Sequence, residues 1–192
     1  MAQEVVLVRH GETEWSRTLR HTGRTDVELT ELGRRQAEVV GKALRGRQFV
    51  LVLTSPLRRA AETCRLAGFG DVARVHDDLR EWDYGDYEGR TTADIRKEVP
   101  GWAVFRDGVP NGETVEEVGA RADRVVAKVR AAGGDVLLFA HGHFLRILAA
   151  RWLDLGPRDG RLFALDPATL SVLGYEREQP VVRVWNQPVG SA

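Results

Sequence analysis

Two histidines stand where apolar runs of the sequence end, and each is followed by a glycine. His10 comes directly after the run 6–9, whose last residue is an arginine, and His141 comes directly after the run 135–140. A buried strand that stops at polar or charged residues places them at the carboxyl edge of a sheet, where open α/β folds keep their sites. An imidazole that directly follows such a strand is held rigidly, so His10 is a candidate nucleophile.

Arginines accompany these strand ends. Arg9 precedes His10, and Arg59 lies in the first turn of a helix that we predict after a second apolar run, 49–53. Guanidinium groups and helix N-termini both favour anions such as phosphate. If the three strands are neighbours, the two arginines and His141 can neutralise a phosphate monoester. We therefore predict that a neutral His10 attacks phosphorus and forms a phosphohistidine, without a metal or a cofactor.

An acidic and aromatic segment, 77–89, contains turn glycines but shows no clear periodicity. Glu81 within it is a candidate for proton transfer to a leaving group, because a carboxyl group among aromatic rings suits general acid–base catalysis. A surface ion pair between Glu81 and Arg80 is the alternative that the residues alone leave open.

Spacing excludes several other ways of handling phosphate. Gly41-Lys42 is followed by an alanine, which rules out a nucleotide-binding loop of the Gly-Lys-Ser/Thr kind, and no Gly-x-Ser-x-Gly elbow is present. The only cysteine, Cys64, lacks the arginine six positions later that a cysteine phosphatase loop needs. The chain has five histidines, and His141 and His143 lie at a turn rather than on a helix face, so we expect no metal site.

The composition is that of one globular domain, which we place over residues 1–192. Lys plus Arg equals Asp plus Glu at 28 each, so no overall field favours nucleic acid or an anionic membrane as a partner. The single cysteine excludes an intramolecular disulfide, and the sequence shows neither a basic leader nor an apolar run of membrane-spanning length. We therefore expect a cytoplasmic enzyme that acts on a small molecule, and whether it forms a homodimer stays open.

Strands and helices alternate along the chain, which predicts an α/β fold with a mostly parallel sheet. A threonine caps the predicted helix 30–44, and Thr114 and Glu117 form a capping box before a helix that extends to residue 133. Loops are predicted at 15–26 and 102–111, further strands at 73–76, 162–165, 171–175 and 181–185, and further helices at 92–99 and 144–153.

Four motifs stand out along the sequence. They are Leu7-Val8-Arg9-His10-Gly11-Glu12-Thr13 with Trp15, Ser55-Pro56-Leu57-Arg58-Arg59-Ala60 with Thr63, Leu79-Arg80-Glu81 with Tyr84-Gly85 and Glu88-Gly89, and Ala140-His141-Gly142-His143. Together they resemble the histidine phosphatase superfamily, which is phosphoglycerate mutase-like, and the resemblance covers residues 5–155. It implies a single α/β domain with a mixed, mainly parallel sheet flanked by helices.

The resemblance also implies roles for single residues. His10 is the phosphorylated nucleophile, and the phosphoryl group is held by Arg9, Arg59 and His141. Glu81 matches the residue that gives a proton to the leaving alkoxide and later takes one from water. Further matching positions bind the substrate: Ser16, where many members have asparagine, and Thr22, Gly23, Tyr84, Gly142 and His143.

Several nearby residues have other or open roles. Trp82, Trp102 and His143 fit either core packing or the wall of a pocket. We expect His21 and His76 to be structural or to face solvent, and Arg58 to lie on the surface.

Within the family, the motifs are nearest those of the branch that contains sedoheptulose-1,7-bisphosphatase and bacterial broad-specificity acid phosphatases. This implies a metal-independent hydrolase of small phosphomonoesters, such as sugar phosphates or bisphosphates. A cofactor-dependent phosphoglycerate mutase is one alternative, although the family's mutases are longer and have Arg-His in place of Trp82-Asp83. A non-catalytic phospho-ligand binding protein is another, but all five core residues are present. Three extra arginines fit either a second phosphate or a solvated loop: Arg17, Arg20 and Arg24.

Overall fold

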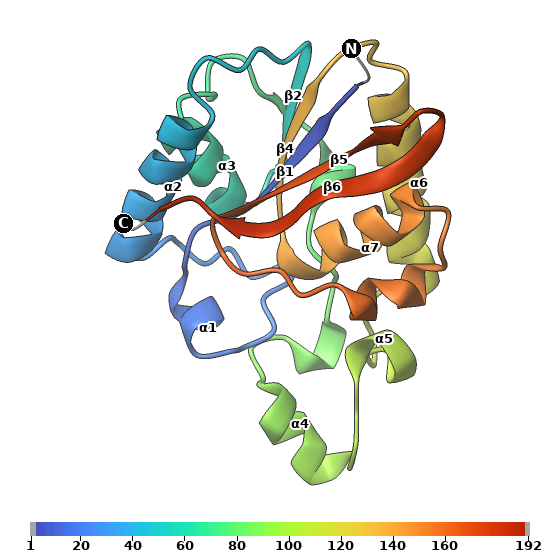
Figure 1. The fold of residues 1–192 in the computed structure, drawn as a ribbon. Coiled ribbons are helices and arrows are strands. Elements are labelled where there is room, and N and C mark those ends of the chain that lie inside the picture. The colour runs from blue at the N-terminus through green and yellow to red at the C-terminus, as the bar shows by residue number, and fades with distance from the viewer. Residues whose placement is uncertain (1–2, 191–192) are drawn as a thin grey trace.

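The computed structural model describes residues 3–190, in which six strands form one sheet (Figure 1). The strands are β1 (Val5–Arg9), β2 (Leu51–Thr54), β3 (Arg74–Val75), β4 (Val136–Ala140), β5 (Thr169–Glu176) and β6 (Gln179–Pro188). Their order in the sheet is β3-β2-β4-β1-β5-β6. The first four strands pair in parallel, and β5 and β6 add an antiparallel edge. This confirms the predicted mixed, mainly parallel sheet.

Helices cover both faces of the sheet (Figure 1). Side chains alternate along β1, so that Val6 and Val8 pack with Val40 and Cys64 on one face, while Leu7 packs into the core of the other face. Every residue of β4 is buried, as expected of a central strand with helices on both sides. The helices that form the two layers are α2 (Glu31–Ala43) and α3 (Arg58–Leu66) on one face, and α6 (Val115–Arg130) and α7 (Gly142–Trp152) on the other.

The register of the central strands brings the carboxyl ends of β1, β2 and β4 together. Arg9 lies opposite Ala140 in the sheet. The backbone bonds continue one residue further, because His10 N donates to Ala140 O at 3.0 Å and Ser55 N donates to Phe139 O at 2.9 Å. Residues that follow three separate apolar runs therefore lie side by side at one edge.

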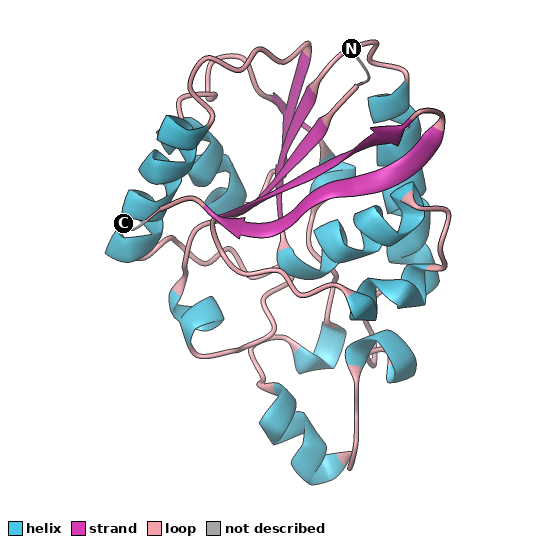
Figure 2. Ribbon diagram, viewed as in Figure 1, coloured by secondary structure: helices cyan, strands magenta, loops and turns pink. Residues whose placement is uncertain are grey.

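Loops and short helical turns gather beyond this carboxyl edge (Figure 2). Among residues 3–190, no helix combines the length and the apolar character needed to cross a bilayer. The short elements are α1 (Glu14–Arg17), α4 (Thr92–Glu98), α5 (Val104–Asp107) and 3₁₀ turns at Asp77–Leu79, Gly85–Tyr87 and Pro157–Leu162.

The predicted strand at 162–165 is wrong. The chain crosses the carboxyl edge of the sheet here, and Ala168 N donates to the carbonyl oxygens of both Arg9 and His10 at 3.1 Å. Leu165 is buried in this crossing segment. Its apolar side chain therefore closes the end of the sheet instead of adding a strand to it.

Several predicted boundaries also change. The loops predicted at 15–26 and 102–111 each contain residues of a single helical turn, α1 and α5, which is too short to show a period in the sequence. Helix α7 begins at Gly142 rather than at the predicted Phe144, because its first turn is polar and was not part of the apolar pattern.

The capping box of α6 is confirmed and gives a test of local stability. Thr114 Oγ1 accepts from Glu117 N at 3.2 Å, and Glu117 Oε2 accepts from Thr114 N at 2.8 Å. We expect Thr114→Ala to lower the free energy of unfolding by about 1 kcal/mol, because it leaves a helix N–H without its partner. Urea denaturation measures this loss, and Thr114→Ser serves as the control that keeps the cap. Equal stability of the alanine and serine variants would contradict the expected contribution.

Candidate active site

His10 lies buried at the end of β1 with one ring nitrogen already bonded. Its Nδ1 lies 2.8 Å from the carbonyl oxygen of Gly11. A carbonyl oxygen only accepts, so Nδ1 carries the hydrogen and Nε2 keeps its lone pair. Burial lowers the pKa of His10 well below its usual value, and the charges of Arg59 and Arg9 lower it further. At neutral pH the imidazole is therefore neutral and nucleophilic at Nε2.

His141 faces His10 from the neighbouring strand end. The two ring centroids lie 5.2 Å apart. Ser55, at the end of β2, orients His141 through a hydrogen bond between Ser55 Oγ and His141 Nε2 at 2.7 Å. Burial, and then the charge of Arg59, lowers the pKa of His141 well below its usual value. Its Nδ1 is buried and has no hydrogen-bond partner.

Arg59 is fully buried and is held by backbone carbonyl groups. Its Nη2 donates to the carbonyl oxygens of Thr22 and Gly23, both at 2.9 Å, and its Nη1 donates to that of Thr25 at 3.0 Å. The guanidinium thus anchors the loop after α1. Its Nε is buried and has no hydrogen-bond partner.

Arg9 is held in a similar way by the segment that crosses the sheet edge. Its Nη1 donates to the carbonyl oxygen of Leu165, and its Nε is buried without a partner. The guanidinium lies against the start of α7, where a Cβ on Gly142 would stand 3.2 Å from Arg9 Cζ. The absence of a side chain at Gly142 therefore leaves room for the Arg9 guanidinium.

Three unpartnered nitrogens surround the His10 imidazole. Within residues 3–190, four buried side-chain nitrogen or oxygen atoms lack a hydrogen-bond partner, and three of them are Arg9 Nε, Arg59 Nε and His141 Nδ1. Buried polar groups are nearly always hydrogen-bonded, so such a concentration indicates a binding site. Two guanidinium charges make it a site for an anion.

Glu81 is held at the N-terminus of α7. Its Oε1 accepts from Phe144 N at 2.9 Å and from Trp82 N at 3.0 Å, and its Oε2 accepts from His143 N at 3.0 Å. The first turn of a helix has free N–H groups that favour a carboxylate. Arg80 pairs with another residue, Asp77, so Glu81 does not form the surface ion pair that the sequence left open.

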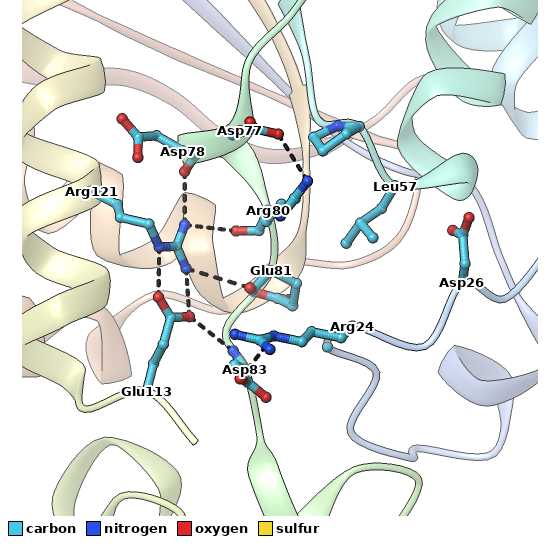
Figure 3. Close-up of a pocket in the computed structure, with 12 residues that line it drawn as sticks. Arg24, Asp26, Leu57, Asp77, Asp78, Arg80, Glu81, Asp83, Glu113 and Arg121 are labelled. Carbon is cyan, nitrogen blue, oxygen red and sulfur yellow. Dashed lines mark hydrogen bonds and ion pairs between the residues drawn. The ribbon is translucent and has the colours of Figure 1, made fainter. Parts of the chain in front are cut away.

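The His10 cavity has a volume of about 90 Å³ and contains most of the predicted substrate-binding residues. Gly23 instead lines a larger cavity of about 590 Å³, and Glu81 lines both. Figure 3 shows Glu81 among the residues that line the larger cavity. Arg59 and His141 lie fully buried behind these walls. No three His, Cys, Asp or Glu side chains of the described chain are grouped as a metal ion would need. The predicted residues that line the His10 cavity are Arg9, Ser16, Thr22, Glu81, Tyr84, Gly142 and His143.

Three residues that had no predicted role in the site also line the His10 cavity: His21, Arg146 and Leu165. Arg20 lines it as well, and it is one of the three arginines that the sequence left open for a second phosphate. His21 does not face solvent as one of our expectations had it, since it is buried and packs against Tyr84 with ring centroids 4.8 Å apart. Arg146 follows His143 by three residues, a spacing that puts both on one face of a helix. That signal was missed because the predicted helix began after His143.

Aromatic rings close the cavity on one side. Tyr84 Oη is hydrogen-bonded to Nδ1 of His143, and burial raises the pKa of Tyr84 well above its usual value. Trp82 and Trp102 are buried and line neither cavity, so they serve core packing. His143, the third residue with an open role, is part of the wall.

The sequence matches a model of the histidine phosphatase superfamily (branch 1) over residues 5–188. Three relatives are an acid phosphatase of Mycobacterium tuberculosis, a sedoheptulose 1,7-bisphosphatase of Saccharomyces cerevisiae and a 2,3-bisphosphoglycerate-dependent phosphoglycerate mutase of Mesorhizobium japonicum. The first is 45% identical over 90% of this chain and 86% of its own length. The second is 39% identical over 79% and 68%, and the third is 38% identical over 77% and 80%.

A solved structure agrees with these matches. The product of an open reading frame from Mycobacterium tuberculosis superposes with a TM-score of 0.93 at 41% identity, over 98% of this chain and 99% of that one. The fold described above therefore has a counterpart of nearly the same length.

Burial of His21 predicts a dependence of stability on pH. Burial lowers the pKa of His21 from 6.5 to about 4, so between these values the unfolded chain binds more protons than the fold. The contribution of neutral His21 to the free energy of unfolding is fully present above pH 6.5 and is lost as the pH falls towards 4. We expect this residue to remove about 2 kcal/mol of unfolding free energy between pH 7.5 and pH 5.

Urea denaturation at the two pH values measures this difference in the wild type and in His21→Gln. The variant is expected to lose that much less stability on acidification, and an unchanged loss would show that His21 is not buried in its neutral form.

Proposed function

The chain belongs to the histidine phosphatase superfamily, branch 1, and we propose that it hydrolyses small phosphomonoesters through a phosphohistidine on His10. The observation that carries this proposal is the set of three unpartnered nitrogens around the His10 ring: Arg9 Nε, Arg59 Nε and His141 Nδ1. They are charged or polar donors directed at no protein acceptor, beside a neutral nucleophile.

In the first step, His10 Nε2 attacks phosphorus. The P–N bond forms as the bond from phosphorus to the leaving oxygen breaks, and Glu81 in its acid form gives a proton to that oxygen. Arg9 and Arg59 stabilise the charge on the transferring group. Ser55 accepts from Leu57 N at 3.2 Å and has its hydroxyl hydrogen free for His141 Nε2, which leaves the hydrogen of His141 on Nδ1.

In the second step, water attacks the phosphohistidine. Glu81, now a carboxylate, takes a proton from the water, the P–N bond breaks, and phosphate leaves. His10 returns to its neutral form with the hydrogen on Nδ1 still donated to Gly11. The charges of Arg9 and Arg59 stabilise the transferring group in both steps, because phosphorus stays in the same place while its bond changes from the ester oxygen to His10 and then to water.

The substrates we propose are sugar phosphates with a second anionic group. Arg20 and Arg146 line the His10 cavity beyond the phosphoryl-binding set. Arg17 and Arg24 pair instead with Glu14 and Asp83. The relative named as a bisphosphatase supports a bisphosphate substrate. One cysteine in the whole chain supports a reducing compartment, so we place the reaction in the cytoplasm.

Trapping the covalent intermediate tests the proposal. A rapid alkaline quench during turnover of a sugar phosphate preserves a phosphohistidine, whose P–N bond survives alkali but not acid. Peptide mass spectrometry is expected to locate the phosphoryl group on His10, and His10→Ala is expected to abolish it and to lower turnover by about 10⁴-fold or more. His76→Ala, a histidine outside both cavities, is the matched control that keeps the intermediate.

The same assay separates the alternatives. Conversion of 3-phosphoglycerate into 2-phosphoglycerate without release of phosphate would favour a mutase. Tight phosphate binding with neither turnover nor a phosphoenzyme would favour a binding protein and would refute catalysis.

Arg146 gives a second prediction, on substrate selectivity. Its Nε donates to Gly160 O at 3.1 Å, which leaves the Nη groups for a ligand. We expect Arg146→Met to raise KM for a sugar bisphosphate by about 10- to 100-fold, because a hydrogen bond to a charged group is lost. KM for the matching monophosphate should stay within about 3-fold.

Steady-state kinetics on the two substrates measure this difference, with Arg17→Met as the control for an arginine outside the cavity. An equal rise in KM for both substrates would show that Arg146 does not bind the second anionic group.

A further inference from the structure

A nearly buried arginine on α6 holds the backbone of the segment that contains Glu81 (Figure 3). The Arg121 side chain is 12% exposed. Its Nη1 donates to the carbonyl oxygens of Asp78 and Arg80 at 2.7 and 3.0 Å, and its Nη2 donates to that of Glu81 at 3.4 Å. Nε and Nη2 each donate to one oxygen of Glu113 at 2.8 Å. All five N–H groups of the guanidinium therefore have an acceptor.

Glu113 extends this support to the residues that follow Glu81. Its Oε2 accepts from Asp83 N at 3.0 Å, and its carbonyl oxygen accepts from Trp82 Nε1 at 2.8 Å. The backbones approach so closely that a Cβ on Gly112 would lie 2.3 Å from Asp83 O. Arg121 and Glu113 thus fix the main chain on both sides of Glu81.

The carboxylate of Glu81 is held separately, by the first turn of α7. The Arg121 guanidinium carbon lies 5.2 Å from the ring centroid of Phe144, whose backbone N–H binds Glu81. Arg121 lines the larger cavity and not the His10 cavity. It can therefore affect catalysis through the position of Glu81 rather than through contact with the phosphoryl group.

We propose that Arg121 and Glu113 are positioning residues that set Glu81 for proton transfer to the leaving group, an inference that rests on the proposed function of Glu81. A catalytic acid must lie within hydrogen-bond reach of the leaving oxygen, and a misplacement of about 1 Å can cost about 10²-fold in rate. Loss of Arg121 frees three carbonyl groups and one carboxylate, so the segment shifts. The phosphate-binding nitrogens lie on other elements and keep their places.

Dependence on the leaving group tests this role. The values of kcat/KM are compared for an alkyl phosphate, whose alkoxide needs a proton, and for 2,4-dinitrophenyl phosphate, whose phenolate does not. Glu81→Gln sets the reference and is expected to lose about 10³-fold on the alkyl phosphate only. Arg121→Gln is expected to lose about 10²-fold on the alkyl phosphate and to stay within about 3-fold on the aryl phosphate. The inhibition constant of orthovanadate, a probe of the phosphate site, should stay within about 3-fold in both variants.

Two further variants supply the controls. Arg121→Lys keeps the charge but not the planar fork of donors, so it should show the same selective loss. Arg124→Gln removes the next arginine on the same face of α6, which pairs with the side chain of Asp78 at 2.6 Å, and both substrates should be turned over at the wild-type rate.

Each outcome decides between the proposals. An equal loss on both substrates in the Arg121 variants, or a failure of Arg121→Gln, Arg121→Lys and Glu113→Gln alike to fold, would mean that Arg121 is only structural and would overturn the inference. If Glu81→Gln itself shows no dependence on the leaving group, the proposed function of Glu81 fails instead.

Discussion

Two guanidinium groups, that of Arg59 buried and that of Arg9 partly buried, lie beside a neutral imidazole without a carboxylate of the described chain in a salt bridge to either. Within residues 3–190, neither Arg9 nor Arg59 forms a salt bridge, and both are held by backbone carbonyl oxygens. Carbonyl dipoles satisfy the N–H donors but leave the formal charges in place, which is costly in a buried site. In the proposed function, a doubly charged phosphoryl group offsets that cost. Burial, and then the positive field of these arginines, lowers the pKa of His10 and His141, so one arrangement supplies both the proposed anion site and the proposed nucleophile.

The sheet is what makes this arrangement possible. Parallel pairing of β1, β4 and β2 places the residues after three strands at one edge, at spacings fixed by backbone hydrogen bonds. Ser55 then sets the orientation of His141 from the neighbouring strand end. The positions of His10 and His141 are therefore set by the most buried part of the protein, while carbonyl groups of the loops hold the two guanidinium groups.

The parts of the site that could be predicted are those with a local signature. A polar residue after an apolar run marks a strand end, which is why His10 and His141 could be recognised. Thr114 and Glu117, three residues apart, likewise predicted the start of α6. The spacing of Arg146 from His143 was a signature that the predicted start of the helix at residue 144 concealed. His21 lacked one, because its place in the cavity depends on how the loop after α1 folds back. The strand predicted at 162–165 failed for the same kind of reason. Apolar residues there cover the sheet edge, a tertiary role that periodicity cannot distinguish from strand formation.

The main chain of Glu81 is supported by an element outside the proposed phosphoryl site, and this separation has a functional consequence. Its main chain is fixed from α6 through Arg121, and its carboxylate lies on the first turn of α7. The proposed affinity for a phosphoryl group and the placement of Glu81, the proposed proton donor, therefore rest on different contacts. Substitutions at distant sites that share no partners act additively. A substitution that moves Glu81 can therefore leave the affinity for the phosphoryl group unchanged. In the proposed function, residues such as Arg20 and Arg146, which belong to neither support, can then set a substrate preference without loss of the phosphoryl site.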